Sequence, residues 1–234
     1  MNLNSYQYVN LRGGINMLNE ELADDDKFMR VKPSKLYLYL KRIMDVVGSL
    51  IGIIILAPLY LLVAILIKLD SKGPIIFSQE RVGLNGEKFK MYKFRSMVVN
   101  AEELKEKLKK RNERKGPMFK IKEDPRVTKI GRFIRRTSID ELPQLINVLK
   151  GEMSLVGPRP SLPKEVMQFE SWMLERLDVK PGLTCYWQVQ GRDDIPFEEW
   201  MELDIKYVRE RNIWIDIKLI FKTFTVLIGD KNAS

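Results

Sequence analysis

The feature that most constrains this chain is an uncharged stretch of 22 residues, Val46–Ile67. Its residues are all apolar except Gly48, Ser49, Gly52 and Pro58. A straight helix of this length extends about 33 Å, which matches the roughly 30 Å hydrocarbon core of a bilayer. A soluble surface helix would instead show a single apolar stripe. The stretch therefore predicts a segment that inserts into a membrane.

Pro58 leaves two ways of inserting open. Proline lacks an amide hydrogen and clashes with the carbonyl four residues earlier, here that of Ile54. A kinked helix could still cross the bilayer, because membrane-spanning helices tolerate proline. Alternatively, the segment forms a hairpin that enters and leaves by the same face, since residues 46–57 provide only roughly 18 Å of helix. Basic residues on both flanks give no charge asymmetry that would orient a crossing helix. They are Lys41, Arg42, Lys68 and Lys72.

Asp45 lies where the apolar stretch begins. A carboxylate is costly deep in a bilayer. We therefore expect Asp45 at the membrane interface, close to Lys41 or Arg42.

Composition narrows the chemistry that this chain can perform. Among its 234 residues there is no histidine and one cysteine, Cys185. Mechanisms with a Ser-His-Asp or Cys-His pair are excluded, as are internal disulfides and cysteine metal clusters. There is no GxxxxGK[ST] or GxGxxG phosphate loop. Catalysis must therefore rest on carboxylates, Lys, Arg, Tyr, hydroxyls or an oxygen-bound cation such as Mg²⁺.

The charge of the chain has several explanations. Forty Lys and Arg against 31 Asp and Glu give a net charge of +9. This excess suits an anionic membrane, a phosphate-rich substrate, nucleic acid or simply a solvated basic surface. The basic stretches carry no interleaved aromatic residues and no nucleic-acid motif.

The segment pattern predicts an α+β fold that is mostly helical. We expect a polar tail over residues 1–34, a membrane anchor over 35–72 and a catalytic domain over 73–234. Two strands, Pro74–Val82 and Glu87–Ser96, flank a glycine-containing turn and predict a small β-hairpin. Helical segments are expected over Ala101–Lys115 (or a loop there), Ser138–Leu149, Leu162–Leu177, Phe197–Arg211 and Ile213–Ile228.

The last predicted helix is amphipathic. Its large apolar residues share one face at helical spacing. They are Trp214, Ile217, Phe221, Phe224 and Ile228. Such a face packs against a core by default, although aromatic residues beside lysines also suit a lipid interface.

The strongest candidate for chemistry is the acidic pair Asp140 and Glu141, which follows two arginines. Ser138 and Glu141 match a helix capping box, and acids favour the first turn of any helix. With Ser138 as the cap, however, Pro143 would break a backbone hydrogen bond, whereas Asp140 as the cap avoids this. In both arrangements the carboxylates lie at a helix start beside positive charge, a place that suits a phosphate. A carboxylate there can act as a nucleophile or a magnesium ligand.

Several basic residues are further candidates. Arg159 stands out because prolines on both sides stiffen the chain, and a guanidinium held in place suits bidentate phosphate binding. Each of the others is, taken alone, most simply a surface charge. They are Lys93, Arg95, Arg126 and Arg192.

Six motifs, taken in order, resemble the bacterial sugar transferases, also called monotopic phosphoglycosyl transferases. They are Lys41–Asp45, Lys90–Met97, Asp124–Arg126, Arg135–Gln144, Leu155–Pro160 and Pro181–Arg192. The resemblance covers the chain from Lys35 onward and leaves residues 1–34 outside. Cys185 departs from the pattern, because many members carry glycine there, and forms with cysteine look like the hexose-phosphate branch.

The resemblance implies an enzyme that moves a sugar-1-phosphate to undecaprenyl phosphate. The expected donor is UDP-glucose or UDP-galactose. The family passes through a covalent aspartyl phosphosugar intermediate, releases UMP and begins exopolysaccharide, capsule or lipopolysaccharide O-antigen synthesis. It uses Mg²⁺. On this sequence Asp140 would be the nucleophile and a metal ligand, and Glu141 would assist.

Further roles follow from the same resemblance. Binding of the substrate phosphates would fall to Lys93, Arg95, Arg126, Arg135, Arg136 and Arg159, with Gln188 and Arg192 helping to place the nucleotide-sugar. The membrane anchor would comprise Lys41, Arg42, Asp45 and Pro58, and the family's anchor is a re-entrant hairpin broken at a proline. The implied location is the cytoplasmic face of the bacterial inner membrane.

The implied partners are a UDP-sugar, undecaprenyl phosphate and the lipid bilayer, without nucleic acid, and a homodimer is compatible with the sequence. Two other hypotheses remain. One is a membrane-anchored basic module that binds an anionic polymer or nucleic acid. The other is a single-pass scaffold protein.

Overall fold

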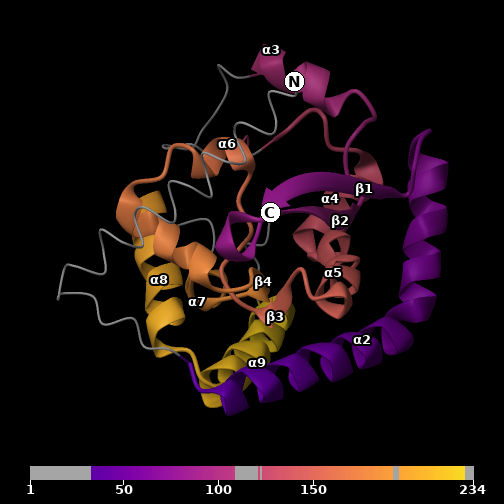
Figure 1. Cartoon of the computed structure of the whole chain (residues 1–234). Helices are drawn as coiled ribbons and strands as arrows, with labels where there is room; N and C mark the ends of the chain where they lie inside the picture. Colours follow the sequence, from indigo (N-terminus) through magenta and orange to yellow (C-terminus); the bar gives the residue numbers. More distant parts are fainter. Residues whose placement is uncertain (1–32, 109–120, 122, 192–194, 230–234) are drawn as a thin grey trace, which may run out of the picture.

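The structure is a computed structural model that describes residues 33–108, 121, 123–191 and 195–229. The predicted tail, residues 1–34, lies almost wholly outside this range. Figure 1 shows one long helix, α2, running beside an α+β body. The elements are α2 (Lys35–Asp70), β1 (Ile76–Val82), η1 (Leu84–Gly86), β2 (Lys88–Phe94), α3 (Ala101–Leu108), α4 (Lys129–Arg136), η3 (Ile139–Glu141), α5 (Gln144–Lys150), β3 (Ser154–Val156), α6 (Pro163–Val166), η4 (Ser171–Asp178), β4 (Gly182–Thr184), α7 (Tyr186–Gln190), α8 (Phe197–Glu210) and α9 (Ile213–Gly229), where η marks 3₁₀ helices.

The predicted β-hairpin is confirmed. Strands β1 and β2 are antiparallel, with Ile76 opposite Phe94 and Val82 opposite Lys88. The turn between them uses a left-handed backbone at Asn85, a conformation that asparagine tolerates. A second, parallel pair joins β3 and β4. The described chain is therefore mostly helical with small sheets, as the sequence predicts.

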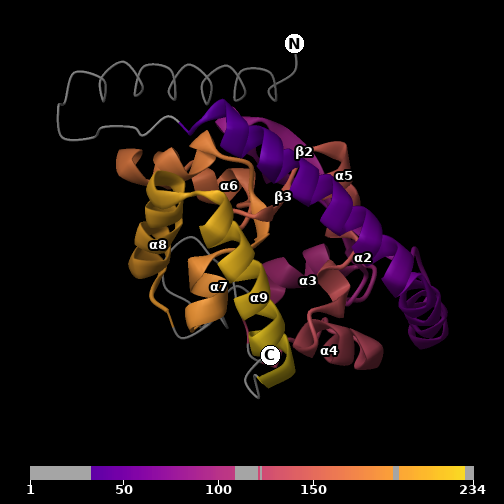
Figure 2. The same ribbon diagram turned by 90° about the horizontal axis from the view of Figure 1, so that it is seen from below.

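Helix α2 is long and apolar enough to cross a membrane by length and composition, and 11% of its most apolar window is buried against the protein. Figures 1 and 2 show it as two arms joined by a bend. Pro58 lies inside the helix, and proline is a common cause of such bends. Residues 35–70 thus form one bent helix, and its insertion as a re-entrant hairpin stays a prediction. The Ser34 hydroxyl accepts a hydrogen bond from the Tyr37 amide and caps the first turn.

The first arm of α2 is fastened to the body by polar side chains. Asp45 is 2% exposed and accepts hydrogen bonds from the Ser154 hydroxyl and the Leu155 amide, both at 2.9 Å. Arg42 donates to two carbonyls at the end of α5, at 2.8 Å each. Asp45 is therefore buried within the protein, and its expected place at the membrane interface stays a prediction. Its burial is tolerated because its carboxylate is hydrogen-bonded to β3.

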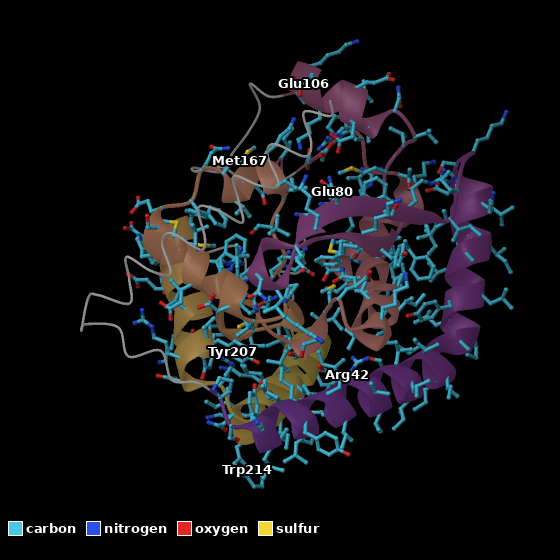
Figure 3. All side chains as sticks on the ribbon, in the orientation of Figure 1. Arg42, Glu80, Glu106, Met167, Tyr207 and Trp214 are labelled. Carbon is cyan, nitrogen blue, oxygen red and sulfur yellow. The ribbon has the colours of Figure 1, made fainter. Side chains whose placement is uncertain are left out.

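Helix α9 turns its aromatic residues outward. Trp214, Phe221 and Phe224 are 76%, 68% and 59% exposed, and Figure 3 shows Trp214 pointing away from the body. The default expectation that this face packs against the core is wrong. The opposite face is buried instead, because Asp216 forms an ion pair at 2.9 Å with Lys41 of α2.

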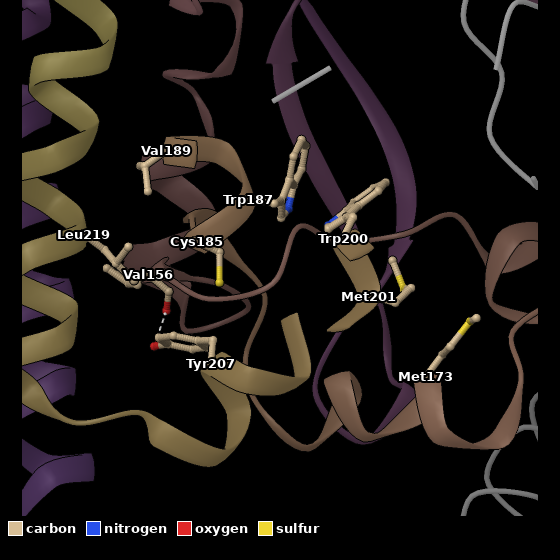
Figure 4. Packing of buried hydrophobic residues seen from close by; sticks show 9 residues of the cluster. All are labelled: Val156, Met173, Cys185, Trp187, Val189, Trp200, Met201, Tyr207 and Leu219. Carbon is tan, nitrogen blue, oxygen red and sulfur yellow. Dashed lines mark hydrogen bonds between the residues drawn. The ribbon is translucent and has the colours of Figure 1, made fainter. Parts of the chain in front are cut away.

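The main core lies among β3, η4, α7, α8 and α9 (Figure 4). The rings of Trp187 and Trp200 are 4.4 Å apart at its centre. Its buried members are Val156, Met173, Cys185, Trp187, Val189, Trp200, Met201, Tyr207 and Leu219.

The remaining helix predictions have different outcomes. The single helix expected over Leu162–Leu177 is two short elements, α6 and η4. The segment expected as a helix or loop over Ala101–Lys115 begins as α3, and its residues 109–115 lie outside the described range. The helices expected over Phe197–Arg211 and Ile213–Ile228 are confirmed as α8 and α9.

Candidate active site

Asp140 and Glu141 lie on the 3₁₀ turn η3, between α4 and α5. Ser138 adopts a left-handed backbone with φ of 56° and makes no side-chain cap. Pro143 occupies the N-cap position of α5. Both capping arrangements considered from the sequence are therefore wrong, and the helix expected over Ser138–Leu149 is split. Proline cannot donate the backbone bond that a continuous helix would need, so the acidic pair remains on a separate turn.

Glu141 is held by two cations. Its Oε1 atom accepts from Lys93 Nζ at 2.7 Å and from Arg159 Nη2 at 2.6 Å. Burial alone would raise the pKa of Glu141, but Arg159 and Lys93 outweigh it and hold that pKa well below its usual range. Glu141 is therefore ionised and serves as the centre of an ion-pair network.

Asp140 differs from its neighbour. It is 7% exposed, and its closest cation is Lys93, whose Nζ lies 3.9 Å from Asp140 Oδ2. Burial raises the pKa of Asp140; Lys93 opposes this shift, while the charge of Glu141 adds to it. A buried carboxylate without a close ion pair is poorly stabilised and therefore suited to attack an electrophile or bind a cation.

Two further contacts position the cations around this pair. Asn147 of α5 accepts from the Tyr92 amide at 3.0 Å and donates to the Lys90 carbonyl at 2.7 Å, which ties β2 and its Lys93 to α5. The Asn147 amide can pair with the backbone of β2 in the way a neighbouring strand would, because a side-chain amide both donates and accepts hydrogen bonds.

The segment that carries Arg159 is held in place by the buried ion pair of Arg176 and Asp204. Arg176 of η4 donates to the Arg159 carbonyl at 2.7 Å and to the Ser161 hydroxyl. Asp204 of α8 pairs with Arg176 at 2.6 Å, and both side chains are almost fully buried. The position of Arg159 thus depends on α8, far away in the sequence.

A cavity of about 1900 Å³ opens over the acidic pair. Asp140, Glu141, Lys93 and Arg159 form a polar part of its wall. Apolar residues of α2 and α9 line another part, namely Leu40, Ile43, Val47, Ile51, Ile55, Ile217 and Phe224. The same cavity therefore presents charged groups and an apolar surface.

Arg95 and Arg126 are engaged within the protein. Arg95 donates to the backbone carbonyls of residues 71 and 72, at 2.7 and 2.6 Å, which secures the chain after α2. Arg126 forms an ion pair with Asp124 at 2.6 Å. Both line the cavity, but these contacts favour a structural role over the predicted phosphate binding.

The remaining predicted residues have different positions. Arg135 and Gln188 line the cavity, and Arg135 lowers the pKa of Asp140. Gln188 donates from its amide to the Leu183 carbonyl at 3.5 Å. Arg136 is exposed and is not part of the cavity wall. Arg192 lies outside the described residues.

Sequence reasoning missed Arg81, which lines the same cavity from the end of β1. Nothing local distinguishes this arginine from a surface residue of a strand. Its neighbour Val82 is joined to Ser161 by a backbone hydrogen bond of 2.9 Å, and this long-range contact helps to bring Arg81 to the site.

The described residues contain no group of three or more carboxylate or cysteine side chains that could form a complete metal cage. Mg²⁺ does not require one, because it is commonly bound by one or two carboxylates together with substrate phosphates and water. Asp140 fits that pattern, since it lines the cavity and has no close ion pair.

The fold and the site together define an α+β domain with one long apolar helix and a cavity lined in part by charged side chains. Comparison with known proteins identifies the family. The Bacterial sugar transferase family matches residues 36–230, and the chain belongs to it.

Three relatives illustrate the similarity. Galactosyl transferase CpsE of Streptococcus agalactiae serotype III is 49% identical over 193 residues, covering 82% of this chain and 43% of that protein. Undecaprenyl-phosphate galactose phosphotransferase of Salmonella typhimurium is 45% identical, covering 83% and 42%. Exopolysaccharide production protein ExoY of Rhizobium meliloti is 37% identical, covering 78% and 83%. The chain thus spans less than half the length of the first two.

Proposed function

We propose that this protein transfers a hexose-1-phosphate, from UDP-galactose or UDP-glucose, to undecaprenyl phosphate at the start of exopolysaccharide synthesis. The observation that carries the proposal is the contrast within the acidic pair. Glu141 is ion-paired to Lys93 and Arg159, whereas the adjacent Asp140 is buried without a close ion pair. The names of the relatives support the lipid acceptor, and two of them support galactose.

The chemistry needs two displacements at phosphorus. A carboxylate oxygen of Asp140 attacks the sugar-side phosphorus of the UDP-sugar, and the bond to the bridging oxygen breaks to release UMP. An oxygen of the lipid phosphate then attacks the same phosphorus and frees Asp140. A covalent step of this kind lets a soluble donor and a lipid acceptor use one site in turn. Lys93 and Arg159 would stabilise the negative charge on the transferred group.

Mg²⁺ is part of the proposal. Asp140 would hold it together with oxygens of the donor diphosphate, and the ion would neutralise charge on these phosphates. Burial raises the pKa of Asp140, and the protein's own contribution is the positive charge of Lys93 and Arg135, which opposes that rise and favours the ionised form.

We further propose that the bent α2 enters the bilayer from the cytoplasmic face and returns to it, with the aromatic face of α9 at the lipid surface. The exposed apolar side chains of both helices support this arrangement. Cysteines placed at Ser34 and Ser71 test it, because these positions bracket α2. Protection of both from an impermeant thiol reagent in intact cells is expected. Labelling of one alone would indicate a crossing helix.

The activity is tested by UMP release from protein held in nanodiscs with undecaprenyl phosphate and Mg²⁺, across a panel of UDP-sugars. We expect lipid-dependent release with UDP-galactose or UDP-glucose. Salt-sensitive binding of an anionic polymer without release from any donor would instead favour a binding module. Loss of turnover upon chelation, restored by added Mg²⁺, is the expected result for the metal.

A further inference from the structure

Arg81 is a cation in the cavity wall to which no role has been given. It lies next to the last residue of β1, and Val82 ties that strand end to the segment that carries Arg159. The side chain of Arg81 is 17% exposed. A guanidinium that is this buried is usually held by a carboxylate or a full set of acceptors.

Arg81 has hydrogen-bond partners but no close ion pair among the described residues. Its Nη2 donates to the Gln79 side chain at 2.8 Å, and its Nη1 lies 3.4 Å from the Pro160 carbonyl. Its Nε is buried and has no hydrogen-bond partner within the described chain. Glu165 is 3.9 Å away, and the oxygen concerned already accepts from the Leu162 amide at 2.8 Å. Arg81 therefore has hydrogen-bond donors and a positive charge that are available to a ligand.

A second cation stands close to it. Burial, followed by like-charge repulsion from Arg159, lowers the pKa of Arg81 to about 10, although the carboxylates of Glu165 and Glu141 oppose this shift. Arg159 is neutralised by Glu141 at 2.6 Å, whereas Arg81 forms no ion pair with Asp140 or Glu141 among the described residues. Two guanidiniums near one cavity, only one of them tightly paired, form a place that an anion would stabilise.

The donor of the proposed reaction carries two linked phosphates. The attacked phosphate must lie against Asp140, and so within reach of Lys93 and Arg159. The other phosphate, attached to uridine, then lies one bridging oxygen further along the cavity. Arg81 contacts the carbonyl of the residue that follows Arg159 and lines the same cavity.

We propose that Arg81 binds the uridine-side phosphate of the donor and stabilises the departing UMP. This inference rests on the proposed function. When the bond between the sugar-side phosphorus and the bridging oxygen breaks, its electron pair stays with UMP, whose phosphate gains a negative charge. Donors of Arg81 placed there stabilise that charge, and they act in the UMP-releasing step alone.

The test separates the two displacements in nanodisc-held protein. UMP release is measured in a single turnover without lipid acceptor, transfer from the preformed sugar-phosphate enzyme to undecaprenyl phosphate is measured separately, and UMP affinity is measured by calorimetry. For Arg81→Gln we expect UMP release to slow by roughly 10²-fold, as for loss of one charge-stabilising donor. UMP affinity should fall about tenfold, and the transfer to lipid should be unchanged. Arg81→Lys, which retains the charge, should recover part of both losses.

Arg209→Gln is the matched control, because Arg209 pairs with Glu175 on the surface and is not part of the cavity wall. Equal slowing of both steps by Arg81→Gln would show a structural role and overturn the inference, as would slowing of lipid transfer alone. If Arg81→Gln does not fold, Arg81→Lys is used instead. A UMP affinity of Arg81→Lys equal to that of the wild type would also overturn the inference. Wild-type protein that neither binds nor releases UMP would instead overturn the proposed function itself.

Discussion

Two clusters of buried polar side chains can be compared in this molecule. The site cluster consists of Asp140, Glu141, Lys93 and Arg159. The anchor cluster joins α2 to α8 and α9 and consists of Lys41, Asp216, Tyr37 and Tyr207. In the anchor cluster, Asp216 accepts from Lys41 at 2.9 Å, from Tyr37 at 3.0 Å and from Tyr207 at 2.7 Å.

The difference lies in how well each buried aspartate is satisfied. Both carboxylate oxygens of Asp216 have donors, as expected for a buried charge that holds a structure together. Asp140 has no ion pair closer than 3.9 Å within the described residues. An arrangement that costs stability is expected where chemistry requires it. The comparison therefore separates an aspartate kept for reaction from one kept for assembly.

The largest effect is expected from Asp140→Asn. The substitution preserves shape but removes the nucleophile, so transfer should fall by at least about 10³-fold. Sedimentation with membranes should be unchanged, because α2 and α9 are untouched. Full transfer by this variant, measured as lipid-dependent UMP release, would contradict the assignment.

The same variant should be more stable than the wild type at neutral pH. The pKa of Asp140 is raised in the folded state, so its stabilising, protonated form is lost as pH rises through that pKa. A carboxyl group whose pKa is raised by folding costs stability at any pH above its ordinary range, and asparagine removes this cost. A thermal melt should show the gain at pH 7 and little difference at acidic pH.

A smaller effect on free energy is expected from Asp216→Ala. Lys41 is left buried without its carboxylate, and such a loss typically costs about 3 kcal/mol of unfolding free energy. Denaturant titration in detergent measures it. Arg209→Gln, which breaks an exposed pair with Glu175, should cost less than about 1 kcal/mol. Equal costs for the two variants would refute the distinction between the anchor cluster and the surface.

The smallest effect is expected from Lys93→Met. Lys93 lowers the pKa of Asp140, so its loss should raise that pKa and move the acid limb of the rate profile to higher pH. At neutral pH the rate should fall roughly tenfold. Recovery of part of this loss at higher pH is the sign of an electrostatic role. A loss that is the same at every pH would mean that Lys93 acts on position alone.

Patterns among residues close together in the sequence determined several helices and strands of this protein and the location of its acidic pair. The uncharged stretch Val46–Ile67 predicted the long helix, and alternation around a turn predicted β1 and β2. Gly151 ends α5 with a left-handed φ of 85°, a conformation that glycine adopts without strain. The acidic pair was identified from its place beside basic residues and a proline. All of these signals are local in the chain.

Tertiary structure alone decided which of these residues meet. Lys41 and Asp216 are 175 residues apart, yet their ion pair sets the inward face of α9 and so sends its aromatic residues outward. Arg81 reaches the site through long-range contacts, because Val82 pairs with Ser161 and Arg81 itself lies 3.4 Å from the Pro160 carbonyl. Hydrophobic periodicity shows that a helix or strand has an apolar side, but not what covers that side. The free energy of a buried charge depends on partners that packing supplies, and these are not adjacent in sequence.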